Sequence, residues 1–280
     1  MTSEQTIDPA PMTGEPVLST NGLSVAFGGV KALTDVTIRV LPGQLVGLIG
    51  PNGAGKTTCI DALTGFVTSS GRIDFDGTDI SGWAAHKRAH RGLMRTWQST
   101  EIFSDLTVAE NLMIGSATHN IKHVLLDLIA PGRKRELTPV LPYLERFGIA
   151  DLADRMPSEL SSGQRKLVGV ARALAAKPRL VLMDEPAAGL DSHESLALGA
   201  HLRGVVDDGT SILLIDHDMG LVLSVCDYLY VLDSGLLIAE GTPAQIRRNK
   251  HVLAAYLGET DENASLDGGA AEPPADGPAG

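Results

Sequence analysis

The 280-residue sequence has few aromatic residues, only two cysteines and no long hydrophobic run. Cys59 and Cys226 are far apart, which excludes a zinc-binding pattern or a disulfide framework, and we predict that both are buried apolar fillers. No apolar run approaches the ~18 residues that a membrane-spanning helix requires. The N-terminus lacks the basic and apolar segments of a secretory signal. A reduced, cytosolic compartment fits these absences best.

The excess of negative charge is confined to the two ends of the chain. The net charge is −11, but residues 1–16 contribute three acids and residues 259–280 contribute six, and neither segment contains a base. Both ends are rich in Pro, Gly, Ala and Ser, and this composition predicts a disordered N-terminal extension and a disordered acidic tail. The body between them is nearly neutral, so we expect no nucleic-acid partner.

Within the body, strands alternate with helices. The apolar runs LVGLIG, RLVLMD and SILLID predict strands buried in a parallel sheet. Residues 107–177 have the three- and four-residue apolar spacing of helices, and residues 228–241 read as a closing hairpin. The pattern predicts an α/β fold with a P-loop core and a helical subdomain at about residues 99–178.

The segment GPNGAGKT, residues 50–57, follows a predicted strand and opens a predicted helix. It matches the phosphate-loop pattern, in which glycines let backbone N–H groups close around the β-phosphate. Lys56 is expected to reach the β- and γ-phosphates, and the Thr57 hydroxyl is expected to ligate Mg²⁺. The predicted nucleotide contacts of this loop are Gly50, Pro51, Asn52, Gly53, Ala54, Gly55, Lys56, Thr57 and Thr58.

Acidic residues end the strand RLVLMDEP. Asp184 is placed to hold Mg²⁺ directly or through water. Glu185 points beyond the strand, where a carboxylate can deprotonate an attacking water. The alternative is that these acids only solvate a loop, as acids at strand ends often do.

Three single residues leave two interpretations open. Gln98 could touch Mg²⁺ or the attacking water, and His217 could donate to the γ-phosphate, but each could be an ordinary loop residue. Phe27 closes the alternating strand LSVAF and could stack on adenine. It shares a face with Leu23 and Val25, so a plain core phenylalanine is an equal alternative.

Four cations, Lys87, Arg88, Arg91 and Arg95, gather within ten residues. The default interpretation is a solvated helix face, and the alternative is a contact with an anionic partner.

The segment LSSGQ, residues 160–164, opens a second predicted helix with the residues of an anion site. Together with residues 50–57, Gln98, LMDEP, AGLD and His217, it resembles the ATP-binding subunit of an ABC transporter over about residues 17–258. The resemblance implies an ABC ATPase fold, with a mixed sheet, an N-terminal antiparallel β subdomain and an inserted helical subdomain. It also implies ATP hydrolysis with Mg²⁺, in which Glu185 is the general base, His217 senses the γ-phosphate and Gln98 senses a transmembrane partner.

In that family two ATPase subunits pair head to tail. The signature segment of each subunit, which is LSSGQ in this sequence, caps the ATP bound by the other subunit. The resemblance therefore implies contacts with the partner's nucleotide from Ser161, Ser162, Gly163 and Gln164, and a place for Asp191 at the dimer interface. The second subunit could be identical or a paralogue. Transmembrane permease subunits and, indirectly, a substrate-binding protein are further expected partners, which places the chain at the cytoplasmic face of the membrane.

The segments RTWQSTEIFSDLTVAENLMIG, DEPAAGL and the closing IAEGTPAQI resemble the branched-chain amino-acid uptake type. Related branches for urea and other amides, and for lipopolysaccharide export, share much of this pattern. Trp97 replaces the usual Phe, and Ser162 replaces the usual signature Gly, a change that we interpret as tolerated. Two alternatives remain: a regulatory module that binds ATP but barely hydrolyses it, and an exporter ATPase. A soluble ABC ATPase acting on ribosomes or DNA fits less well, since those proteins carry tandem cassettes or long inserts.

Overall fold

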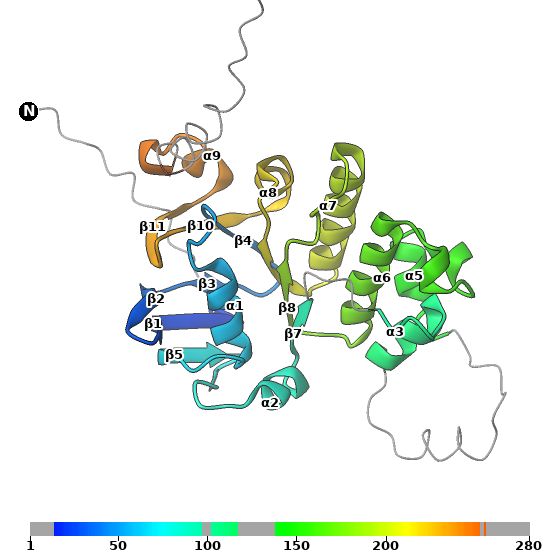
Figure 1. The fold of residues 1–280 in the computed structure, drawn as a ribbon, viewed down its shortest axis with the longest axis horizontal. Helices are drawn as coiled ribbons and strands as arrows, with labels where there is room; N and C mark the ends of the chain where they lie inside the picture. Colours follow the sequence, from blue (N-terminus) through cyan, green and yellow to red (C-terminus); the bar gives the residue numbers. More distant parts are fainter. Residues whose placement is uncertain (1–13, 97–101, 117–137, 253–254, 256–280) are drawn as a thin grey trace, which may run out of the picture.

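The computed structural model describes residues 14–96, 102–116, 138–252 and 255. The predicted acidic tail lies outside this part of the chain, as does most of the predicted N-terminal extension. Two sheets and a group of helices make up the described fold (Figure 1). Their arrangement confirms the predicted α/β class with a mixed sheet.

The first sheet is antiparallel and is built from the N-terminal quarter of the chain. Its strand order is β2-β1-β5-β6, and β3 pairs with β1 off this path. The strands are β1 (Leu18–Phe27), β2 (Val30–Val36), β3 (Arg39–Val40), β5 (Ser70–Phe75) and β6 (Thr78–Asp79). This sheet corresponds to the antiparallel β subdomain that the family resemblance implies.

The second sheet has the order β11-β10-β4-β9-β8-β7. All its pairs are parallel except β10–β11, which form the predicted hairpin. The strands are β4 (Leu45–Ile49), β7 (Leu93–Thr96), β8 (Leu180–Asp184), β9 (Ser211–Ile215), β10 (Tyr228–Asp233) and β11 (Leu236–Gly241). The three apolar runs of the sequence therefore form β4, β8 and β9, which are adjacent in the sheet.

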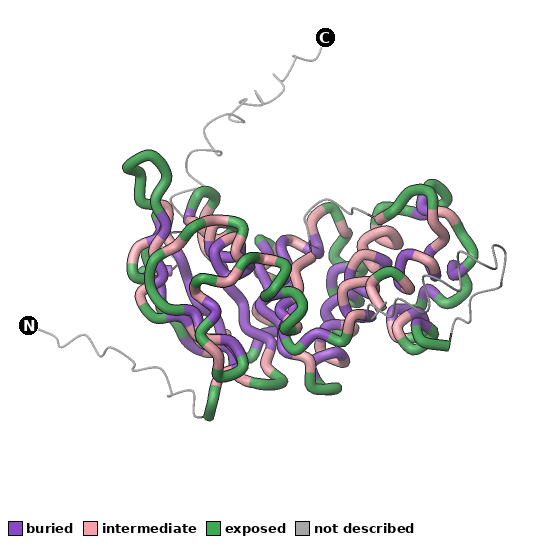
Figure 2. Tube along the Cα trace, turned by 90° about the horizontal axis from the view of Figure 1, so that it is seen from below, coloured by how far each residue is buried: buried purple, intermediate pink, exposed green. Residues whose placement is uncertain are grey.

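Both faces of the parallel sheet are covered by apolar cores. In β8, Val181 and Met183 face the core shared with the C-terminal helices, whereas Leu180 and Leu182 face the core shared with α1 and the antiparallel sheet. Figure 2 shows the buried segments running through the middle of the molecule. Because successive side chains of a strand point to opposite faces, a strand buried on both sides needs a continuous apolar run.

The described helices fall into longer and shorter segments. Those longer than one turn are α1 (Lys56–Thr64), α2 (Ala85–His90), α3 (Val108–Ser116), α5 (Leu141–Arg146), α6 (Ser162–Ala175), α7 (Ser192–Asp207) and α8 (Met219–Val225). The shorter segments are η1 (Ala150–Leu152), η2 (Pro157–Glu159) and α9 (Pro243–Ile246). In Figure 1, α3, α5 and α6 lie together at the end of the molecule away from the antiparallel sheet. Across the described residues, no helix has the length and apolarity to span a bilayer.

The interpretation of the basic group as a solvated face is wrong for two of its four members. Arg88 is only 3% exposed, and its guanidinium donates to the backbone carbonyls of Ala62, Leu63, Ser81 and Trp83. Ala62 and Leu63 lie in the last turn of α1, where carbonyl groups lack full helical pairing and a guanidinium can donate to them. The Arg95 side chain is only 7% exposed and pairs with the carboxylates of Asp61 and Asp184. The prediction that both cysteines are buried is confirmed.

Candidate functional site

Three parts of the predicted nucleotide site lie at the same edge of the parallel sheet. The phosphate loop follows β4, Asp184 ends β8, and His217 comes shortly after β9. Since β4, β9 and β8 are parallel neighbours, their carboxyl ends meet at one edge, where α/β sheets place ligands. Gln98, which follows β7 in the sequence, lies outside the described residues.

The phosphate loop is held open by glycines. Gly50 has a φ of 150°, and a Cβ there would lie 2.0 Å from the carbonyl oxygen of Leu232. Gly55 has a φ of 99°, and its Cβ would lie 2.7 Å from the carbonyl oxygen of Ala32. Only glycine tolerates both the backbone conformation and the close approach.

The Lys56 ammonium folds back over this loop. It donates to the carbonyl oxygens of Gly50 at 2.6 Å and Pro51 at 2.8 Å. Helix α1 begins at Lys56, and its N-cap, Gly55, offers no side-chain acceptor. The first turn also contains no acidic residue. A positive helix end next to an ammonium can bind a phosphate group.

Asp184 is buried at the end of β8, with 1% of its surface exposed. Its Oδ2 accepts from Nη2 of Arg95 at 3.1 Å, and Arg95 also pairs with Asp61 of α1. Its Oδ1 is buried and has no hydrogen-bond partner among the described residues. Burial raises the pKa of Asp184, and Arg95 opposes that rise. A buried carboxylate oxygen without a donor fits a hydrated cation.

Glu185 follows Asp184 with its backbone in the left-handed region, at a φ of 50°. Its N–H donates to the carbonyl oxygen of Ile215 at 2.7 Å, which joins the ends of β8 and β9. His217 lies alongside, with Nδ1 4.0 Å from Glu185 Oε1, and its side chain is 66% exposed. The structure therefore brings together the carboxylate and the imidazole that were singled out separately in the sequence.

Asp216, which the sequence analysis did not single out, links the loop after β8 to the loop after β9. It is 1% exposed, and it accepts from the N–H of Ala187 and from the N–H of Asp218, both at 3.0 Å. One buried carboxylate thus connects the loop after β8 to the loop after β9. The only signal in the sequence was an acid at the end of an apolar run.

The signature segment forms the predicted helix start. Ser161 is the N-cap of α6, where its hydroxyl accepts from the N–H of Gln164 at 3.1 Å. The Gln164 side chain in turn accepts from the N–H of Ser161 at 2.9 Å, which completes a capping box. Ser162 is exposed at the first helical position.

Contacts with α7 place the signature segment near the loops that follow β8 and β9. A Cβ on Gly163 would lie 2.9 Å from Oε1 of Glu194, in the first turn of α7. Asp191 is the N-cap of α7 and forms a capping box with the same Glu194. On α6, burial lowers the pKa of Lys166, against the opposing effect of the carboxylates of Asp216, Glu185 and Glu194.

Phe27 is not a core residue. It ends β1 beside a two-glycine turn, pairs with Val30, and is 52% exposed. The register of β1 on β2 shifts between Leu23 and Val25 and again between Val25 and Ala26, so the regular alternation assumed from the sequence is not kept. The core alternative is therefore wrong, and adenine stacking stays a prediction.

Residues 33–188, more than half of the chain, match the family described as ABC transporter. The chain is an ABC transporter ATP-binding subunit. Residues 237–262 separately match the family described as branched-chain amino acid ATP-binding cassette transporter. As a member of this family the chain is an ATPase, as the resemblance implied.

The chain spans nearly the full length of the curated relatives that it matches. The chain is 40% identical over 253 residues to the high-affinity branched-chain amino acid transport ATP-binding protein BraF of Pseudomonas aeruginosa, covering 87% of this chain and 98% of BraF. It is 39% identical to the high-affinity branched-chain amino acid transport ATP-binding protein LivG of Escherichia coli, covering 88% of this chain and 99% of LivG. It is also 38% identical to the lipopolysaccharide export system ATP-binding protein LptB of Escherichia coli, covering 86% and 97%.

Solved structures agree with the fold. A nucleotide-free ATP-binding cassette from an ABC transporter superimposes with a TM-score of 0.76 at 32% identity, covering 86% of this chain and 99% of that one. A cassette in its ADP conformation gives a TM-score of 0.76 at 33% identity, covering 88% and 100%. Both confirm the ABC ATPase fold.

Proposed function

We propose that this subunit binds ATP with Mg²⁺, pairs with a second ATPase subunit, and drives a transmembrane permease that imports branched-chain or related amino acids. The observation that carries the proposal is the arrangement at the sheet edge. There, a glycine loop with a lysine, a buried carboxylate with an orphaned oxygen, and a Glu–His pair leave three neighbouring strands.

Binding of Mg-ATP is assigned to the loop that follows β4 and to residues of α1 and β8. The phosphate loop and Lys56 hold the phosphates, while Thr57 and Asp184 hold Mg²⁺. Among the described residues, no group of three or more His, Cys, Asp or Glu side chains could hold a metal alone. This fits Mg²⁺, which proteins usually bind through one or two carboxylates together with substrate phosphates and water.

Hydrolysis is assigned to the loops after β8 and β9. Glu185 accepts the proton of the attacking water, and His217 donates to the γ-phosphate. A left-handed conformation is costly for a residue with a side chain, and such strain occurs at sites where the surroundings impose it. The strained backbone of Glu185 therefore supports a functional role. Gln98 is proposed as a further ligand of Mg²⁺ or of the water.

The second subunit follows from the family resemblance, in which each signature segment meets the nucleotide held by the other subunit. We propose that Ser161, Ser162, Gly163 and Gln164 meet the ATP of the partner subunit and that Asp191 lies at the interface. Gly163 lies against Glu194, which also forms the capping box with Asp191, so the signature helix and the Asp191 loop would approach the partner as one unit. The positive end of α6 favours an anionic ligand.

The cargo and direction of transport come from relatives. BraF and LivG are named for branched-chain amino acid transport, and residues 237–262 match the corresponding C-terminal family. The similarity to LptB keeps an exporter as the second candidate. The proposed partners are permease subunits, which would place the chain at the cytoplasmic face of the membrane, and indirectly a substrate-binding protein.

Glu185→Gln tests the proposed chemistry. The amide keeps the shape of the side chain but cannot accept a proton, so we expect turnover to fall about 100-fold or more while ATP binding is kept. Size-exclusion chromatography with Mg-ATP should then show a trapped dimer of the variant. Lys56→Ala is the contrasting change, and it should weaken ATP binding about 10- to 100-fold by removing a charged donor.

The outcomes separate the candidate functions. Turnover at the wild-type rate in Glu185→Gln would contradict the assignment of the base. Negligible turnover of the unmodified chain together with its permease would favour the regulatory module, for which exposed Ser162 in the signature segment is the supporting observation. For cargo, ATPase stimulation in proteoliposomes by leucine with a substrate-binding protein supports import, and stimulation by lipopolysaccharide instead supports export.

A further inference from the structure

Arg95 joins three elements around the proposed magnesium carboxylate. It lies in β7, which pairs in parallel with β8, and its side chain is only 7% exposed. Its two terminal nitrogens have different partners: Nη2 donates to Oδ2 of Asp184 at 3.1 Å, and Nη1 pairs with Asp61 of α1. A single guanidinium therefore holds β8, β7 and the phosphate-loop helix at fixed relative positions.

The two oxygens of Asp184 are in different situations. Oδ2 is occupied by Arg95, whereas Oδ1 is buried without a hydrogen-bond partner among the described residues. The donors of a guanidinium form a rigid planar fork, so anchoring one nitrogen on Asp61 fixes the direction from which the other meets Asp184. The orientation of the free oxygen follows from that of the occupied one.

We propose that Arg95 is a positioning residue that orients the Asp184 carboxylate for Mg²⁺, with Asp61 as the anchor of its guanidinium. This inference rests on the proposed magnesium role of Asp184. Groups that orient the ligands of a metal site typically change metal affinity about 10- to 100-fold when they are removed. A lysine could keep the charge but not the fork, since its single ammonium cannot reproduce two fixed donors.

A merely structural ion pair would behave differently. Buried ion pairs contribute little net stability, and breaking one destabilises the whole fold because a charge is left without its partner. Such a loss would lower ATP affinity to a similar degree with or without Mg²⁺. A positioning role instead predicts a loss that depends on Mg²⁺.

The decisive experiment is equilibrium binding of ATP to the full chain, with Mg²⁺ and with EDTA, for the wild type and Arg95→Lys. Because the variant keeps the positive charge, its electrostatic effect on the cation is preserved. We expect the ratio of the ATP affinity in Mg²⁺ to the ATP affinity in EDTA to fall about 10-fold in the variant. The affinity in EDTA alone should change less than about 2-fold. Thermal unfolding without nucleotide checks that the variant is folded.

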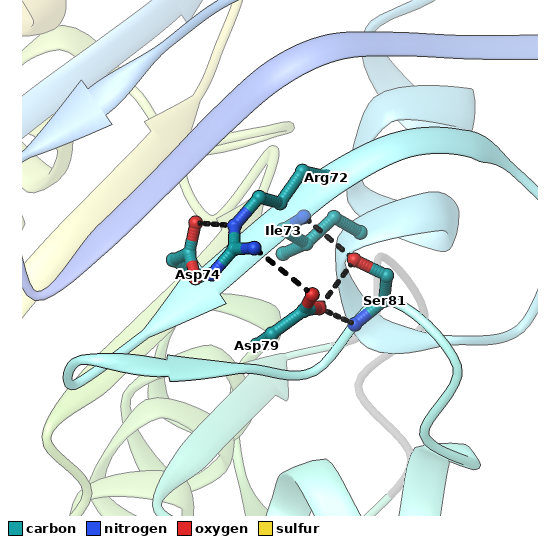
Figure 3. A network of polar contacts seen from close by, with 5 residues as sticks. All are labelled: Arg72, Ile73, Asp74, Asp79 and Ser81. Carbon is teal, nitrogen blue, oxygen red and sulfur yellow. Dashed lines mark hydrogen bonds and ion pairs between the residues drawn. The ribbon is translucent and has the colours of Figure 1, made fainter.

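Arg72→Lys is the matched control. Arg72 also pairs with two carboxylates, Asp74 and Asp79, but it lies on the antiparallel sheet with 58% of its side chain exposed (Figure 3). The same substitution there should leave the affinity ratio unchanged. If Arg95→Lys does not fold, Asp61→Asn decides, since it removes the charged anchor and leaves Arg95 beside Asp184. A lower ratio in this variant supports the inference, and an unchanged ratio overturns it.

Asp184→Asn separates this inference from the proposed function. If Asp184→Asn keeps the wild-type ratio, the magnesium role of Asp184 is wrong. If Asp184→Asn lowers the affinity ratio but Arg95→Lys keeps the wild-type ratio, only the positioning role of Arg95 is overturned. Equal losses with Mg²⁺ and EDTA in Arg95→Lys also overturn it, in favour of a structural ion pair.

Discussion

The two helix starts proposed to meet ATP phosphates, at α1 and α6, are built in opposite ways. Helix α1 begins after Gly55, without a side-chain cap and without an acid in its first turn. Helix α6 begins after Ser161, with a complete capping box that includes Gln164. The N-terminal donors of α6 are thus partly satisfied by its own residues, whereas α1 has no side chain that caps its donors.

The shapes of the two segments also have different origins. The phosphate loop is fitted against distant backbone, because Gly50 and Gly55 lie against the carbonyls of Leu232 and Ala32. The turn at Ser161 is specified by residues within three positions of each other. We therefore expect changes at α1 to disrupt ATP binding directly, and changes at α6 to act on pairing with a second subunit.

The largest effect should come from Gly55→Ala. The substitution forces a side chain into the left-handed region and against the Ala32 carbonyl, so we expect a loss of about 2 kcal/mol or more in the free energy of unfolding. ATP binding, measured by calorimetry, should disappear because the loop cannot keep its shape. Gly148→Ala is the control, since Gly148 has a φ of 62° with open space around it. ATP binding by Gly55→Ala at wild-type affinity would show that the loop is adaptable rather than fixed by its contacts.

A smaller effect is expected from Ser161→Ala. Losing an N-cap typically costs about 1 kcal/mol of stability, and hydrogen exchange should localise the loss to the first turn of α6. ATP affinity of the monomer should stay unchanged, whereas the ATP-dependent dimer of the Glu185→Gln background should weaken.

The matched control for Ser161→Ala is Thr242→Ala, which removes the cap of a similar capping box at α9. Thr242→Ala should cost similar stability without affecting the dimer. If both variants dimerise equally well, Ser161 has only a structural role.

The smallest effect concerns a third helix start, at α8, which is capped by a carboxylate. The hydroxyl of Ser195 and the N–H of Leu221 donate to Asp218, and they lower its pKa below the ordinary value of 3.8. The depressed pKa contributes stability above the ordinary pKa, and this stability is lost as pH falls through the lower folded value.

Asp218→Asn should therefore be less stable than the wild type near neutral pH, and the difference should shrink below about pH 4. Urea unfolding at several pH values measures this. The corresponding difference for Ser161→Ala should not depend on pH, because a serine cap does not titrate. A constant difference for Asp218→Asn would show that the cap does not act through its charge.

Local patterns were predicted well because their causes are local. The glycine loop, the capped start of α6 and the buried strands follow from residue types within a few positions. The pairing of Arg95 with Asp184 could not be predicted because the two residues are 89 positions apart in the sequence. A run of basic residues gave no sign of which members turn inward. Phe27 was placed ambiguously because a register shift cannot be read from alternation.

The sequence by itself determined the α/β class, the phosphate loop and the identity of the acids that follow β8 and β9, since these depend on short-range backbone and side-chain chemistry. Only the tertiary structure decided which oxygen of Asp184 has no hydrogen-bond partner among the described residues, that Asp216 joins the loops after β8 and β9, and that Gly163 lies against Glu194. These features depend on which strands are neighbours in the sheet and how helices pack on it. Long-range packing sets those relations, and it brings together side chains that no sequence spacing connects.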